Sequence, residues 1–307
     1  MMGFFNFVTF KLGMDNSSHG ATSRIIRAAR ETIVDRTRAS SSFNEDWRLH
    51  GPNQDISDGL RAVHVWGILG LHDIRQRYRR SFLGPFWFTL STLIMVSVLG
   101  GIYSTLLQQD ISNYVAFLAV GLVVWQYISS VANEGCIAFT TVDYLIKQVR
   151  LPLTVHVVRE VWRNFLILLH SLPIVILLLI GFGKTPSWTL LLAPLGLAAL
   201  FLNGLWLGVV LGILCTRFRD IPPIVANLVQ IAFFVTPVMW APHFIGDRSW
   251  IAMYNPLYHM IEVVRAPILG QNMQVQSWLW VGAILVAGFA TAQLLMKRYR
   301  FRVPYWL

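Results

Sequence analysis

The stretch FLILLHSLPIVILLLIGF, residues Phe165–Phe182, decides the fold class of this chain. It contains no Asp, Glu, Lys or Arg, and its only polar side chains are His170 and Ser171. A helix needs ~20 mostly apolar residues to cross the hydrocarbon core of a bilayer. It tolerates the internal Pro173 because neighbouring groups satisfy the freed backbone carbonyl. We therefore predict a transmembrane helix here.

Other apolar stretches lie on both sides of this one, and all of them follow residue 85. The whole chain is 55% hydrophobic and only 13% charged, whereas roughly 25% charged residues is ordinary for a soluble domain. We predict an all-α polytopic membrane protein. Its six expected spans are Phe86–Leu107, Tyr114–Thr140, Phe165–Phe182, Leu190–Thr216, Ile221–Trp240 and Trp278–Met296.

The distribution of basic residues predicts the orientation of these spans. If the N-terminus is cytoplasmic, the cytoplasmic segments hold 22 of the 25 Lys and Arg residues. Only Lys184, Arg248 and Arg265 then lie outside. Because cytoplasmic loops carry the excess of positive charge, we expect both termini in the cytoplasm. This orientation, rather than binding to nucleic acid, accounts for the net charge of +10.

Two segments precede the first span. Residues 1–56 are rich in Ser, Arg and Asn with weak apolar periodicity, which predicts a basic cytoplasmic tail, largely disordered. In residues 57–85, apolar side chains such as Leu60, Val63 and Leu71 recur every three or four positions. This predicts an amphipathic helix at the membrane interface, capped by Ser57 or Asp58. Packing on a soluble partner is the alternative. Residues 86–307 form the six-span domain.

The last external connection, residues 241–277, is too polar to span but rich in aromatic residues such as Trp250, Tyr254 and Tyr258. Trp and Tyr favour the membrane–water interface. We expect short helices that lie in or re-enter the outer leaflet, one of them bounded by Pro256 and Pro267.

No enzymatic motif is found in the sequence. Gly183-Lys184-Thr185 resembles the end of a phosphate-binding P-loop, but Leu178 occupies the position of the required first glycine. No GxSxG, HExxH or CxxC motif occurs, and the two cysteines have no metal-binding spacing. We therefore expect no catalytic site, metal or cofactor on this chain.

A few polar side chains within the apolar stretches are candidates for function. Glu134 is an intramembrane carboxylate, which by default suggests a function. The alternatives are that it lies near the wet end of the span or that it bonds to a neighbour such as Asn133. We interpret His170 as a satisfied core residue and expect Asn203 to bond across helices. Glu262 and Arg265 have the spacing of a helical ion pair, which we expect to be structural.

Four motifs resemble those of a known transporter family. In chain order they are RYRRSFLGPFW (77–87), LIKQVRLP (145–152), TRFRDI (216–221) and NPLYHMIEVVRAPILG (255–270). Together with the topology, they resemble the permease subunits of bacterial ABC transporters that export O-antigen, capsule or teichoic acid. The resemblance covers roughly residues 60–300 and leaves out the basic tail.

The resemblance implies a homodimer in the bacterial inner membrane, associated with two copies of a separate ATPase subunit. ATP and Mg would bind to that partner, which agrees with the absence of a P-loop here. The implied cargo is a lipid-linked polysaccharide on undecaprenyl diphosphate, of which O-antigen is our first choice.

The resemblance also suggests roles for particular residues. Guanidinium groups bind phosphate oxygens in bidentate fashion, so the lipid diphosphate is expected at Arg75, Arg77, Arg79 and Arg80. The alternative is anchoring to anionic lipid. The residues expected to couple to the ATPase are Leu145, Lys147, Arg150, Pro152, Arg159, Arg217, Arg219 and Asp220.

Two further groups concern the path of the polysaccharide. Aromatic faces stack on sugar rings, and the candidates for a channel lining are Trp87, Tyr103, Trp125, Tyr127, Phe233 and Phe234. The external hairpin is expected to narrow or gate the exit through Asn255, Pro256, Tyr258, Glu262 and Arg265.

Two other classes of protein compete with the permease. A membrane enzyme of the cell-surface glycan pathway would need a cluster of carboxylates or histidines. The outer loops offer only ungrouped residues, namely Asp110, Asp247, Glu262, His243 and His259. A membrane scaffold would need neither the cytoplasmic loop around Leu145–Arg159, which is expected to dock on the ATPase, nor a basic interfacial helix. We therefore favour the permease.

Overall fold

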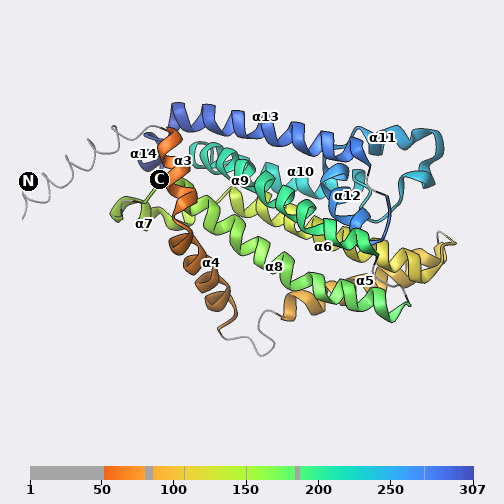
Figure 1. The fold of residues 1–307 in the computed structure, drawn as a ribbon. Coiled ribbons are helices and arrows are strands. Elements are labelled where there is room, and N and C mark those ends of the chain that lie inside the picture. The colour runs from red at the N-terminus through yellow and green to blue at the C-terminus, as the bar shows by residue number, and fades with distance from the viewer. Residues whose placement is uncertain (1–51, 80–85, 107, 150, 184–186, 273) are drawn as a thin grey trace, which may run out of the picture. The chain divides into compact units, whose positions relative to one another are not determined.

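The computed structural model describes residues 52–79, 86–106, 108–149, 151–183, 187–272 and 274–307, and these residues form helices and turns without a strand (Figure 1). The predicted all-α class is confirmed for this part of the chain. The tail, residues 1–51, and Arg80 and Arg150 lie outside the described residues, as does the Gly84-Pro85 joint.

Among the described residues, five helices are long and apolar enough to cross a membrane. They are α5 (Phe86–Leu106), α6 (Ile111–Gly135), α8 (Leu153–Gly181), α9 (Ala193–Arg217) and α13 (Val275–Tyr299). These helices run in alternating directions. Helices α3 (Pro52–Arg61), α7 (Asp143–Gln148) and α14 (Val303–Trp306) lie at one end of the bundle, which we call the C-terminal end (Figure 1). The end with α11 (Trp250–Met253) and α12 (Pro256–Ile268) is the opposite end.

The fifth predicted span, Ile221–Trp240, is a shorter helix than expected. Helix α10 covers Ile221–Val235, 15 residues, which is about 22 Å at the rise of an α-helix and less than the ~30 Å hydrocarbon core. The backbone leaves the helical conformation at Thr236, with ψ 138°. Pro237 explains this, because proline disfavours helical geometry in the residue before it.

Close approach of helices builds the centre of the bundle. Helix α6 is buried over most of its length and packs against α5, α8, α9 and α12. A Cβ atom on Gly208 of α9 would lie 2.7 Å from the Val157 side chain of α8, so only glycine fits there.

Asn203 bonds within its own helix, to the Ala199 carbonyl and the Trp206 indole N–H. The predicted interhelical bond of Asn203 is therefore wrong.

The predicted cytoplasmic loop 141–164 is largely helical. After α7 (Asp143–Gln148), helix α8 begins at Leu153, twelve residues before the predicted span. Val155, Val158 and Val161 are buried along this extension, and their spacing of three explains why the helix continues.

The helix predicted from residue 57 is two helices, α3 (Pro52–Arg61) and α4 (Val63–Tyr78), which are interrupted at Ala62. Because α3 begins earlier than predicted, Asp55 belongs to a docked helix. Its carboxylate accepts hydrogen bonds from the N–H groups of Leu153 (3.1 Å) and Thr154 (3.3 Å) and from the Thr154 hydroxyl (2.7 Å). Asp55 therefore caps the first turn of α8. Burial raises the pKa of Asp55, while these hydrogen bonds act to lower it.

Helix α4 packs against α8 through a face other than the predicted apolar one. Trp66 packs edge-on against Trp162, with ring centroids 5.4 Å apart, and Gly70 lies against the same indole. Val63 and Leu71, which belong to the apolar face predicted to meet the membrane interface, are about half exposed and do not pack in the bundle. Apolar and basic side chains therefore share the exposed surface of α4.

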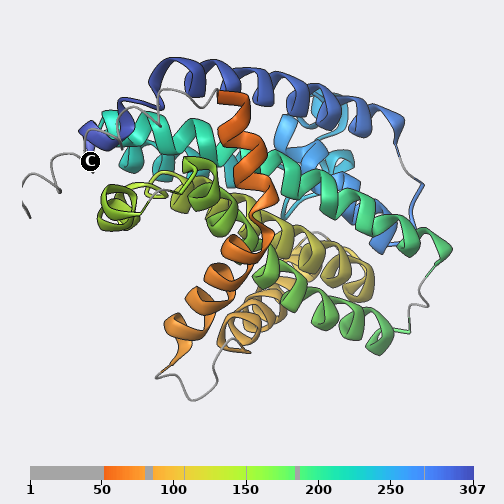
Figure 2. The same ribbon diagram turned by 60° about the vertical axis from the view of Figure 1, so that its left-hand side comes forward.

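The connection between α10 and α13 contains η3 (Pro242–Ser249), α11 (Trp250–Met253) and α12 (Pro256–Ile268). Helix α12 is buried from Tyr258 to Ile268 and packs against α6, α9 and α13 (Figure 2). Pro256 begins this helix as predicted, whereas Pro267 lies inside its last turn.

Candidate functional site

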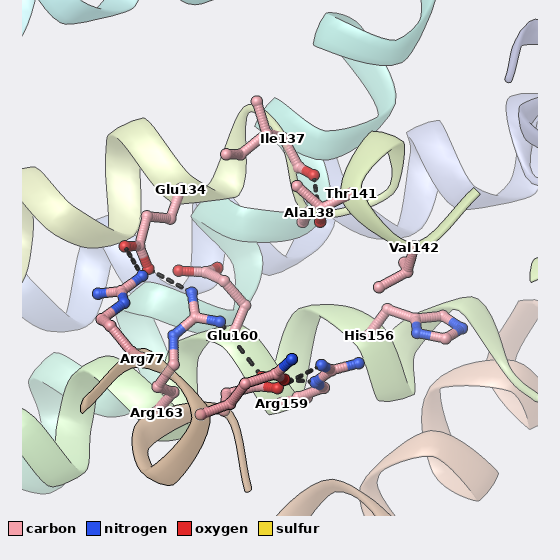
Figure 3. A pocket seen from close by; sticks show the side chains of 12 residues that line it. Arg77, Glu134, Ile137, Ala138, Thr141, Val142, His156, Arg159, Glu160 and Arg163 are labelled. Carbon is pink, nitrogen blue, oxygen red and sulfur yellow. Dashed lines mark hydrogen bonds and ion pairs between the residues drawn. The ribbon is translucent and has the colours of Figure 1, made fainter. Parts of the chain in front are cut away.

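A charged pocket of about 400 Å³ lies toward the C-terminal end of the bundle, between α4, the end of α6, η1 (Thr140–Val142) and α8 (Figure 3). Its lining residues are Asp73, Gln76, Arg77, Glu134, Ile137, Ala138, Thr141, Val142, His156, Arg159, Glu160 and Arg163. Three arginines and three carboxylic residues therefore converge on one cavity.

Ion pairs connect three helices around this pocket. Arg77 of α4 donates to Glu134 of α6 at 2.8 Å, and Arg163 of α8 binds the other oxygen of the same carboxylate. Asp73 of α4 is bound by Arg159, whose Nε lies 2.7 Å away, and by Arg163 at 3.3 Å. Each of the two carboxylates thus binds two guanidinium groups, and together they join α4 to α6 and α8.

The partner predicted for Glu134 is wrong. Asn133 donates to the Ser129 carbonyl of its own helix at 2.8 Å. Glu134 instead accepts from the Asn164 amide at 2.8 Å, in addition to Arg77 and Arg163. Glu134 and Asn133 point in directions about 100° apart around α6, because successive residues of a helix differ by this angle.

Two pocket residues on α8 are nearly fully buried, His156 at 2% exposure and Glu160 at 5%. Both ring nitrogens of His156 and one carboxylate oxygen of Glu160 have no hydrogen-bond partner among the described residues. Asn164 donates to the other Glu160 oxygen at 2.7 Å. Sequence reasoning missed this polar face of α8, although the i, i+4 spacing of His156, Glu160 and Asn164 signals it.

A groove of about 580 Å³ lies between α5, α6 and α10. Three of the predicted channel aromatics meet there, with Trp125 and Phe233 ring centroids 5.5 Å apart and those of Phe233 and Phe234 5.4 Å apart. Sequence reasoning did not single out the polar residues of the groove, which are Ser91, Thr92, Gln126, Ser129, Asn133 and Gln230. The groove is therefore both aromatic and rich in amide and hydroxyl groups.

The other predicted channel residues lie elsewhere. Tyr127 is buried in the core, where its hydroxyl donates to the Leu200 carbonyl at 3.4 Å and its ring packs against Phe165. Tyr127 is two positions after Trp125, so the two side chains point about 200° apart around α6. Trp87 and Tyr103 lie on α5 outside the lining of this groove.

The predicted ATPase-coupling residues fall into three places. Leu145 and Lys147 lie on α7, where Lys147 pairs with Asp143 at 2.7 Å. Pro152 is the N-cap of α8, and Arg159 lies in the charged pocket. Arg217 is the last residue of α9, and Arg219 and Asp220 follow it in the turn before α10.

Arg217 stacks over the Trp306 ring of α14 (Val303–Trp306) at 5.5 Å. The C-terminal helix therefore lies beside the turn between α9 and α10.

Of the predicted diphosphate-binding arginines, Arg75 and Arg79 are exposed on α4 and its C-cap, whereas Arg77 is paired with Glu134.

The residues predicted for an external gate are mostly buried in the bundle. Asn255 caps α12 by accepting from the Leu257 N–H at 2.9 Å, and Pro256 is the first residue of that helix. Glu262 and Arg265 lie 4.0 Å apart, as their i, i+3 spacing suggested. Burial raises the pKa of Glu262, and the Arg265 charge opposes this shift.

Residues 65–269 match the protein family described as ABC-2 type transporter. This chain belongs to that family. The match runs from α4 to the end of α12 and contains all four motifs except Gly270. It therefore places the charged pocket and the groove within the shared transporter domain.

Three relatives illustrate the range of the similarity. An O-antigen export system permease protein RfbA from Klebsiella pneumoniae is 30% identical over 236 residues, which cover 75% of this chain and 90% of the relative. A protein of the same name from Myxococcus xanthus is 30% identical over 63% of this chain and 76% of its own length. The polysialic acid transport protein KpsM of Escherichia coli is 21% identical over 66% and 80%.

Family membership and five helices long enough to cross a membrane together identify a multi-span membrane transporter. The relatives named above are permeases or transport proteins rather than enzymes. The ABC-2 assignment thus favours the permease over the pathway enzyme and the scaffold.

Proposed function

We propose that this chain is the permease subunit of an ATP-driven exporter that moves a lipid-linked polysaccharide, O-antigen on undecaprenyl diphosphate, across the bacterial inner membrane. It works as a homodimer with two ATPase subunits, which bind ATP and Mg. Both termini are cytoplasmic, and α10 with the residues after it completes a sixth crossing. The names of its relatives support the cargo, and the positive-inside distribution supports the orientation.

The groove between α5, α6 and α10 is the observation that carries this proposal. Polar side chains inside a bundle of apolar helices usually bond to other helices. Here Gln126 accepts from the Thr92 hydroxyl of α5 at 3.1 Å, and Asn133 bonds within its own helix. Both still line an open groove together with Gln230, beside Trp125 and Phe233. Sugar hydroxyl groups need amide and hydroxyl partners, and the apolar face of a sugar ring packs well on an aromatic ring. This combination suits a glycan better than a lipid or an ion.

The diphosphate of the lipid carrier binds at α4, which lies at the membrane interface in this proposal. Arg75 and Arg79 are exposed and free to meet it, with Arg80 next in sequence. Arg77 is held by Glu134. Phosphate oxygens form strong charge-assisted bonds with guanidinium groups, so an arriving diphosphate competes with the Glu134 carboxylate for Arg77. This exchange would loosen α4 from α6.

The ATPase docks on the C-terminal end of the bundle. Helix α7 presents Tyr144, Leu145 and Lys147, and the turn with Arg217, Arg219 and Asp220 forms a second contact. Exposed Tyr144 and Tyr305 add apolar surface that a protein partner would cover. At the opposite end, Asn255 and helix α12, which contain the predicted gate residues, act as the gate at the exit of the polysaccharide path.

The test is purification of the tagged chain from its own host in mild detergent, followed by mass spectrometry and by assay of surface polysaccharide in a deletion strain. We expect a stoichiometric P-loop ATPase and loss of surface polysaccharide in the deletion strain. Purification without an ATPase, under conditions that keep a known exporter intact, would refute the permease proposal. An intact surface polysaccharide in the deletion strain would refute the cargo.

A further inference from the structure

Helix α10 forms one wall of the groove and is covered by the rest of the bundle on one side only. It provides Gln230, Phe233 and Phe234 to the groove. None of its residues is buried, and it packs against α6 and, less extensively, α9. An element with few buried apolar contacts is free to shift locally. The position of the groove wall therefore depends on how the ends of α10 are fixed.

The segment Thr236–Met239, which follows α10, is fixed in the interior of the bundle. Thr236 and Val238 are fully buried. The Asn255 amide at the start of α12 donates to the Thr236 hydroxyl at 3.0 Å. The Tyr114 hydroxyl of α6 donates to the Met239 carbonyl at 2.6 Å.

A third contact comes from Arg265, whose side chain is fully buried in α12. Its Nη2 donates to the Pro237 carbonyl at 2.9 Å, and its guanidinium lies 3.9 Å above the Phe117 ring. A Cβ atom on Gly121 would come within 2.8 Å of Arg265 and 2.9 Å of the Val238 carbonyl. Gly121 thus leaves the space that this arrangement requires.

The cost of burying Arg265 points to a role beyond stability. A buried charge is expensive unless it is well paired. Among the described residues, the Nε and Nη1 atoms of Arg265 have no hydrogen-bond partner, and Glu262 is no closer than 4.0 Å. An apolar side chain would fill this space at lower cost. The guanidinium is therefore best explained by its bond to the backbone after α10.

We infer that Tyr114, Asn255 and Arg265 are positioning residues for transport, which hold the end of α10 and so keep Phe233 and Phe234 in the groove. We call these three residues the α10 clamp. Its role in transport rests on the proposed function, because that proposal gives the groove its cargo. The clamp is the fixed end of α10, about which the rest of the helix moves when the groove widens.

The test compares Tyr114→Phe, Asn255→Leu and Arg265→Met with the control Tyr254→Phe. Tyr254 is exposed at the same end of the bundle, outside the clamp and the groove. Each variant is made in a chain whose buried Cys136 and Cys215 are replaced by Ala. A spin label is placed at Ile231→Cys on α10 or at Leu195→Cys on α9, both of which are exposed.

We expect Arg265→Met to lower polysaccharide export about tenfold and Tyr114→Phe about fivefold, in line with the loss of a charged and a neutral hydrogen bond. Membrane abundance and the amount of co-purifying ATPase should be unchanged. The label on α10 should become more mobile, while the label on α9 and the control variant should not change. Arg265→Lys should restore part of the export.

Three results would overturn the clamp. Equal mobility changes at both labels, or loss of the variants from the membrane, would indicate a general structural role. Normal export by Arg265→Met with a more mobile α10 would show that the position of α10 does not matter for transport. The label measurement needs no cargo, so it distinguishes failure of the clamp from failure of the export proposal, which the unmodified chain tests.

Discussion

Arg77 and Glu134, which are 57 positions apart in sequence, form a 2.8 Å ion pair between α4 and the end of α6. The Arg77 side chain is 45% exposed, whereas Arg163, on the other oxygen of Glu134, is only 15% exposed. One carboxylate therefore binds a buried arginine and an accessible one. The accessible pair is the part of the network that an anionic ligand can reach.

The two ion pairs of Glu134 should differ in strength. We expect a coupling energy of about 0.5 kcal/mol between Arg77 and Glu134, because exposed pairs contribute little. For Arg163 and Glu134 we expect a value of at least ~1.5 kcal/mol, because this charged hydrogen bond is better shielded from water. Double-mutant cycles with Gln substitutions and thermal unfolding in detergent measure both values. Equal couplings would contradict the difference in exposure.

The arginines of α4 should be needed for export rather than for insertion. Replacing Arg77, Arg79 and Arg80 together by Gln should reduce export at least tenfold while membrane abundance stays the same, because guanidinium–phosphate bonds are lost. The matched control replaces Lys297, Arg298 and Arg302 by Gln, since these exposed cations lie at the same end of the bundle. An equal effect of both triple variants would indicate a general charge effect instead.

The Asp55 cap should contribute to stability. Asp55→Ala removes the acceptor for the first N–H groups of α8, and loss of an N-cap costs about 1–2 kcal/mol. We expect a lower unfolding temperature in detergent for this variant. Asp58→Ala is the control, because Asp58 is exposed on the same helix. If both variants unfold alike, α3 does not cap α8 in the membrane.

The polar residues of the groove should affect export without affecting assembly. Gln230→Leu removes an amide from the groove wall while keeping a side chain of similar size, so we expect export to fall about tenfold through the loss of hydrogen bonds to sugar. Gln271→Leu, at an exposed position after α12, serves as the control. Radiolabelled polysaccharide exported by proteoliposomes provides the measurement. Unchanged export with Gln230→Leu would remove the groove from the cargo path.

Helix α7 should be required for the ATPase partner. Leu145→Asp and Tyr144→Asp each place a charge on a surface expected to be covered by the partner, where an unpaired buried charge is costly. We expect loss of co-purifying ATPase and of stimulated hydrolysis. Tyr254→Asp carries the same change at the opposite end and should retain both. Retention of the ATPase by the two α7 variants would move the docking site elsewhere.

The amino-acid sequence was enough to predict the membrane class, the family motifs and five of the helices that are long and apolar enough to cross a membrane. Long apolar stretches such as Phe165–Phe182 can be read directly, because a bilayer requires length and apolarity whatever the neighbouring helices do. The early end of α10 can also be predicted from the sequence, because Pro237 disfavours helical geometry at Thr236.

Only the tertiary structure decided which polar groups meet. Asp55 caps α8, Arg77 reaches Glu134, and Arg265 holds the backbone after α10. In each case two segments that are far apart in the sequence are brought together by helix packing. The periodicity of a single helix shows which residues share a face, but it does not show which neighbour covers that face. For this reason the charged pocket, the groove and the clamp could not be assembled from the sequence.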